Sequence, residues 1–127
     1  MTTRAHSNME RILIVVSVLT LVACAPNSYI REQQFGAYRQ QVAAEFDQGR
    51  ITPSKMQEKL RDRYREIYGH DQEMERYYAY AISFLRGAEE GRYDLKDAQA
   101  RVTARREQLL AQRARQKAEE DYTDNYR

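Results

Sequence analysis

The chain has 127 residues, of which 31% are charged and 42% hydrophobic, and its 21 basic and 19 acidic side chains leave a net charge of +2. This length allows one domain, the composition is too polar for a protein that crosses a membrane many times, and the near-neutral charge excludes a strongly basic, chromatin-type chain. The single cysteine excludes an internal disulfide framework and a cysteine-based metal site, and five glycines and two prolines are too few for the turns of a β-sandwich.

A basic start and an apolar segment precede the only cysteine. Arg4 and Arg11 lie before the segment from Ile12 to Val22, which runs for eleven residues without a charge. Eleven helical residues span roughly 16 Å, about half of a bilayer core, so the segment is predicted to be the core of a signal peptide rather than a membrane-spanning helix. It ends in Leu21-Val22-Ala23-Cys24, which resembles the lipobox of bacterial lipoproteins at all four positions.

The resemblance covers residues 1–24 and implies a specific modification. It implies a signal peptide over residues 1–23, cleavage between Ala23 and Cys24, a diacylglyceryl group on the Cys24 thiol, and often an acyl chain such as palmitate on the new amino group. Several chains on one residue make a durable anchor, because each buried CH₂ contributes roughly 0.8 kcal/mol. Residues 24–27 are then the anchor and tether. The alternatives are an ordinary secretory signal peptide with an incidental cysteine, or a short buried helix.

The residue after the cysteine bears on the membrane in which such a lipoprotein stays. In the sorting rule of enteric bacteria, an aspartate at this position retains a lipoprotein in the inner membrane. This chain has Ala25 there. The resemblance therefore favours the outer membrane, with the protein on its periplasmic face.

The rest of the chain predicts an all-α domain over residues 28–118. Apolar side chains recur three and four residues apart in the segments 28–48, 53–68, 72–89 and 94–117, and no stretch alternates with a period of two. The short connections between these segments favour about four helices in antiparallel hairpins. Residues 119–127 have no apolar stripe and are predicted to be a disordered acidic tail.

Glycines and capping residues mark the predicted helix boundaries. Gly49, Gly69 and Gly91 each follow a helical segment and suit the left-handed position just past a helix end. Thr52, Asp71 and Asp94 are the predicted N-caps of the next helices. Segment 72–89 has the widest apolar stripe and is expected to be the most buried, whereas Gly36 and Gly87 are expected to be tolerated inside helices.

The sequence predicts no set of catalytic residues, no set of metal ligands and no cofactor-binding motif. The covalent lipid on Cys24 is the one non-protein group that is expected. One histidine, His70, follows the cysteine, and adjacent acids such as Glu89 and Glu90 are interpreted as solvated charge. The alternative is an enzyme directed at the cell wall, whose carboxylates only folding brings together. Glu66 and Asp94 are one separated pair that could do so.

Two features predict a binding surface. Tyrosines crowd the sequence around Gly69, and among them Tyr80 fits the buried stripe least and is the candidate for the surface. Residues 101–117 carry six bases and one acid, so Arg105, Arg106 and Arg113 are predicted to meet an anionic partner. The alternatives are a core built with tyrosines and a merely solvated basic face, since basic side chains favour the C-terminal half of a helix.

These patterns predict a small lipid-anchored envelope protein that acts by binding, as an accessory or structural partner in the periplasm. The expected partners are membrane lipid through Cys24 and an envelope protein or cell-wall component, and export makes nucleic acid an unsuitable partner. A self-associating helical spacer, and so a homo-oligomer, is kept as a further alternative beside the wall-directed enzyme.

Overall fold

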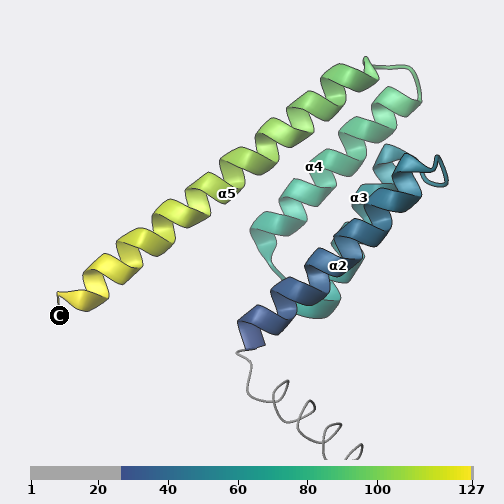
Figure 1. The fold of residues 1–127 in the computed structure, drawn as a ribbon. Coiled ribbons are helices and arrows are strands. Elements are labelled where there is room, and N and C mark those ends of the chain that lie inside the picture. The colour runs from purple at the N-terminus through teal and green to yellow at the C-terminus, as the bar shows by residue number, and fades with distance from the viewer. Residues whose placement is uncertain (1–26, 127) are drawn as a thin grey trace, which may run out of the picture.

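The computed structural model describes residues 27–126, and this part of the chain holds four α-helices and no strand (Figure 1). The predicted all-α fold of about four helices is therefore confirmed. The predicted signal peptide, the Ala23–Cys24 cleavage site and the lipid-bearing Cys24 lie outside the described residues. No described helix is both long enough and apolar enough to cross a bilayer. The helices are α2 (Asn27–Asp47), α3 (Pro53–Tyr68), α4 (Gln72–Glu89) and α5 (Leu95–Asn125).

The helix boundaries have the predicted local structure. Three glycines adopt positive φ angles of 70°, 79° and 82°, a conformation that other residues disfavour; they are Gly49, Gly69 and Gly91. Three helices begin with the predicted capping side chain, whose oxygen accepts a backbone N–H of the first turn; these are Thr52, Asp71 and Asp94. Local chemistry alone therefore sets the start of α3, α4 and α5.

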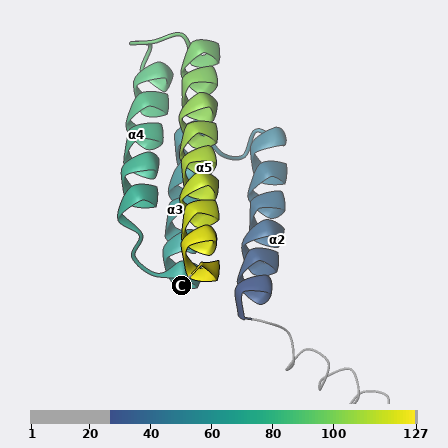
Figure 2. The same ribbon diagram turned by 90° about the vertical axis from the view of Figure 1, so that its left-hand side faces the viewer.

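The helices form a chain of antiparallel hairpins rather than a closed bundle. Each described helix packs against its neighbours in sequence, α2 on α3, α3 on α4 and α4 on α5, and no other pair of them makes close backbone contact. α3 and α4 therefore form the central hairpin, and α2 and α5 each pack on a different helix of it. Figure 2 shows α4 and α2 at the two edges of the molecule, with α5 in front of α3. Because α2 and α5 do not meet, the space between them stays open.

α4 supplies most of the core, as predicted. The buried apolar residues are Val42 of α2, Leu60 of α3, Met74, Tyr77, Tyr78, Ala81, Ile82, Leu85 and Ala88 of α4, and Ala98 and Val102 of α5. Two leucines predicted to be core residues of the last helix are instead 40% and 46% exposed, Leu95 and Leu110. Their exposure follows from the packing, since α5 has only one neighbouring helix and leaves most of its surface uncovered.

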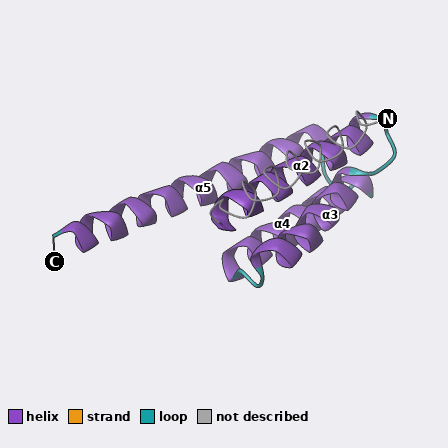
Figure 3. Ribbon diagram, turned by 60° about the horizontal axis from the view of Figure 1, so that its bottom comes forward, coloured by secondary structure: helices purple, strands orange, loops and turns teal. Residues whose placement is uncertain are grey.

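The last helix is longer than predicted, and the expected disordered tail is wrong for residues 119–125. α5 continues to Asn125 because its sequence has no glycine or proline and Ala118, Glu119 and Glu120 are strong helix formers. Residues 114–125, which we call the α5 overhang, are all exposed. They project beyond the other helices (Figure 3).

Candidate binding groove

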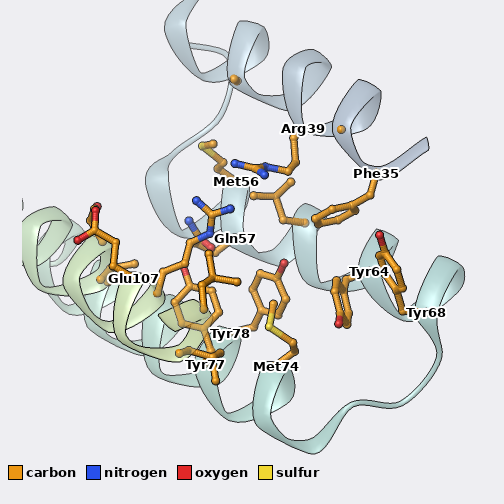
Figure 4. A pocket seen from close by; sticks show the side chains of 18 of the residues that line it. Phe35, Arg39, Met56, Gln57, Tyr64, Tyr68, Met74, Tyr77, Tyr78 and Glu107 are labelled. Atoms are coloured by element: carbon orange, nitrogen blue, oxygen red, sulfur yellow. The ribbon is translucent and has the colours of Figure 1, made fainter. Parts of the chain in front are cut away.

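A groove of about 940 Å³ lies between α2 and α5, and all four described helices line it (Figure 4). α3 and α4 form its floor, and α2 and α5 form its walls. The groove exists because α2 and α5 pack on different helices of the central pair and leave the inner face of that pair uncovered. Residues predicted as core from their spacing therefore line a surface, among them Phe35, Leu60, Tyr64 and Met74.

Aromatic rings form the floor and one edge of this groove. Tyr77 and Tyr78 of α4 are only 5% and 4% exposed, and their ring centroids lie 5.1 Å apart. Tyr64 of α3 lies 6.1 Å from Tyr78 and makes an edge-to-face contact of 5.5 Å with Phe35 of α2. These contacts join α2, α3 and α4, so the tyrosines stabilise the fold, and the partly buried rings of Phe35 and Tyr64 supply the aromatic surface that the groove exposes.

Two arginines flank the buried tyrosines from opposite walls. Burial raises the pKa of Tyr77 and Tyr78, and the positive charges of Arg106 on α5 and Arg39 on α2 act against this rise. Both arginines line the groove together with the two tyrosines. Neither arginine takes part in an ion pair within residues 27–126. Arg106, a predicted binding residue, thus lies in the groove with its charge uncompensated.

One groove residue has a buried polar atom with no partner among the described residues. The side-chain oxygen Oε1 of Gln57 on α3 is buried and accepts no hydrogen bond there. Figure 4 shows Gln57 between Arg39 and the α4 tyrosines. A buried acceptor left without a donor costs free energy.

Asp71 closes one end of the groove by joining three helices. Its side chain caps α4, accepts a hydrogen bond of 3.0 Å from the Tyr64 hydroxyl, and accepts both 2.6 Å and 2.8 Å contacts from Nη2 of Arg113. Burial alone would raise the pKa of the Asp71 carboxyl, but the hydrogen bonds from Arg113, the Met74 N–H and Tyr64 outweigh it and lower the pKa. Arg113 also pairs with Glu73 at 3.1 Å.

The predicted basic surface of the last helix is therefore divided. Arg113 and Arg106 both line the groove, but Arg113 is paired with Asp71 and Glu73, whereas Arg106 has no ion pair among the described residues. Arg105 lies 5.7 Å from the ring of Tyr80, outside the groove. Arg105 and Arg106 diverge because successive residues of a helix point about 100° apart.

Tyr80 belongs to an aromatic strip on the side of α4 away from the groove. Its ring stacks on Phe84 at 5.6 Å, and Phe84 stacks on Tyr93 at 4.6 Å. Tyr80 is 37% exposed, in line with its position at the edge of the buried stripe. The packing of Tyr93 favours a glycine at position 87, because a Cβ atom there would lie only 2.6 Å from Cε2 of Tyr93.

Glu66 and Asp94, the separated pair considered above, do not come together. Glu66 lies near the C-terminal end of α3 and Asp94 just before α5, at opposite ends of the 18-residue α4, which spans about 27 Å. Glu89, interpreted from the sequence as solvated charge, instead accepts two hydrogen bonds of 2.7 Å from the backbone N–H and hydroxyl of Ser54. Among the described residues no group of three or more potential metal ligands lies together.

No protein-family model, curated protein or solved structure matches this chain. The features of this chain that bear on function are the groove and the sequence that precedes α2.

Proposed function

We propose that this protein is a small lipid-anchored protein of the bacterial cell envelope, and that it acts by binding a helical protein segment in the groove. The observation that supports the binding role is the groove of about 940 Å³, which apolar and aromatic side chains of all four described helices line. Amphipathic helices dock in such grooves by placing apolar side chains three, four and seven residues apart against the apolar lining.

The lipobox Leu21-Val22-Ala23-Cys24 supports the anchoring role. α2 begins at Asn27, three residues after Cys24, so lipid on that cysteine would hold the groove close to the membrane. Ala25 favours the periplasmic face of the outer membrane. Binding beside a membrane suits an accessory or structural partner of an envelope assembly.

Replacing Cys24 with serine is expected to abolish lipid attachment and to leave the signal peptide uncleaved. The serine hydroxyl cannot form the thioether that carries the diacylglyceryl group. The measurement is metabolic labelling with a tagged fatty acid, together with the mass of the purified protein. Ala25→Ser is the matched control, because it changes the neighbouring residue and leaves the four lipobox residues in place. Normal labelling and cleavage of the Cys24→Ser chain would contradict the anchoring role.

A photo-crosslinking residue placed at Thr103 is expected to capture the groove's partner in intact cells, because Thr103 lines the groove. The same residue placed at Ala104 is the control. Ala104 is exposed but does not line the groove. A discrete adduct on gels from position 103, absent from position 104, is the expected result. Equal adducts from both positions, or none from position 103, would contradict binding in the groove.

A further inference from the structure

The proposed binding role leaves open what fills the groove, and the projecting half of α5 offers an answer. We infer that the occupant is the α5 overhang of a second copy of this chain. In the inferred dimer the two α5 helices run antiparallel, and each overhang lies in the groove of the other copy. This inference rests on the groove of the proposed function and adds the identity of the partner.

The lengths of the two surfaces agree. The α5 residues that line the groove run from Val102 to Arg113, and the overhang that follows them is exposed throughout residues 114–125. Each segment has about twelve residues, or roughly 18 Å of helix. An antiparallel pair with its twofold axis near Gln112 therefore sets residues 114–122 of each copy opposite the groove-lining residues 102–110 of the other.

One face of α5 runs without a break from the groove to the overhang. Thr103, Glu107 and Leu110 line the groove, and Ala114, Lys117 and Asp121 continue the same face at spacings of three and four residues. In the antiparallel pair Leu110, now 46% exposed, lies against the small side chain of Ala114. Lys117 lies opposite Glu107 of the other copy, so the two opposite charges can form an ion pair.

The charges of the overhang complement those of the groove. Its second half carries four carboxylates, Glu119, Glu120, Asp121 and Asp124. With the axis near Gln112, residues 119–121 of one copy lie opposite residues 103–105 of the other, next to Arg106. Arg39 and Arg106 line the groove from its two walls, so Asp121, which lies on the face that continues the groove, enters between two guanidinium groups that have no ion-pair partner among the described residues.

The inferred pairing is compatible with a shared membrane. α2 begins at the end of the bundle from which the overhang projects (Figures 1 and 3). Both copies therefore place the start of α2 near the twofold axis. Two lipid anchors attached just before Asn27 would then enter one bilayer side by side.

Cysteine cross-linking of the full chain in membranes tests the pairing directly. Two tagged copies are expressed together, one with Leu110→Cys and the other with Ala114→Cys, and a short bismaleimide is added. A product that carries both tags and has twice the mass of one copy is expected. The control pair, Gln108→Cys with Arg115→Cys, lies at the same level of α5 on its other side and should give at least tenfold less product. Copies with Cys24 alone are the blank.

A charge exchange shows whether the overhang and groove charges hold the copies together. One variant carries Glu120→Lys and Asp121→Lys, and the other carries Arg39→Glu and Arg106→Glu. Each variant alone is expected to lose at least tenfold of the cross-linked product, because like charges then meet in both grooves. Mixing the two variants restores opposite charges in both grooves and is expected to restore the product, which also shows that each variant folds.

Two outcomes would overturn the inference. The cysteine pair could give no more product than its control, or mixing the charge variants could fail to restore it. If the Thr103 probe still captures a different protein in that case, the groove binds another partner and the proposed function stands. If the Thr103 probe captures nothing, the proposed function fails as well.

Discussion

Replacing Leu85 with alanine is expected to lower the free energy of unfolding by about 2–5 kcal/mol, because the change leaves a cavity in the packed centre of α4. Leu85 is 2% exposed and belongs to the helix that joins α3 to α5. A small domain has a total stability of roughly 5–15 kcal/mol, so the loss is a large part of the whole. Urea unfolding followed by circular dichroism measures it.

Leu95→Ala is the matched control for this prediction. It removes the same atoms from a leucine that is 40% exposed at the start of α5. Exposed substitutions usually change stability by about 0.5 kcal/mol or less, so the control should unfold close to the parent. Equal losses from the two variants would contradict the central position of α4 in the core.

Replacing Asp71 with alanine is expected to cost about 2–4 kcal/mol. The change removes the cap of α4, worth about 1 kcal/mol, and it takes from Arg113 a charged hydrogen-bond partner, worth roughly 1.5–3 kcal/mol. Asp94→Ala is the control, since Asp94 caps α5 through one hydrogen bond to the Asp97 N–H and is exposed. The control should lose only the cap contribution. A loss no larger than the control's would show that the contacts with Arg113 and Tyr64 add nothing.

The difference between the parent and Asp71→Ala should also depend on pH. The pKa of Asp71 is lowered in the folded protein, and an unfolded aspartate has a pKa of about 3.9. The stabilisation by the Asp71 carboxylate is thus fully present above about pH 5 and is lost as the pH falls through the folded pKa. The two unfolding free energies should therefore converge as the pH falls below about 4. A constant difference over this range would contradict the lowered pKa.

The sequence predicted the elements well because their boundaries depend on neighbouring residues. Thr52, Asp71 and Asp94 cap the predicted helices, and the bounds of α3 and α4 agree with the segments 53–68 and 72–89. The end of α5 was not predicted correctly. A segment without an apolar stripe does not pack against another helix, but it can still continue as an exposed helix. Local patterns therefore determined the helices more reliably than they determined order at the C-terminus.

The groove and its polar contacts could not be predicted from local patterns. An apolar stripe indicates that a helix face packs against something, yet whether α2 meets α5 depends on how both lie on the central pair. The partners of Arg113 and Glu89 are likewise remote in sequence, 42 residues away at Asp71 and 35 residues away at Ser54. The predicted basic face came from counting the charges along one helix, without regard to the direction in which each side chain points. In the structure Arg106 lines the groove, Arg113 is paired with Asp71, and Arg105 lies beside the ring of Tyr80.

The hydrogen bonds and ion pairs between helices are unevenly distributed, and this affects how freely the helices can move. The α3–α4 hairpin is fastened along its length by Ser54 with Glu89, by Arg86 with Glu58, and by Arg65 with Glu75. α2 and α5 are each held along one face only, α2 with a single ion pair to α3, Lys59 with Glu45. Swinging an outer helix therefore disturbs contacts with one neighbour and leaves the hairpin intact. The width of the groove is therefore expected to vary more readily than the packing of α3 on α4, because each outer helix packs on only one helix of the hairpin.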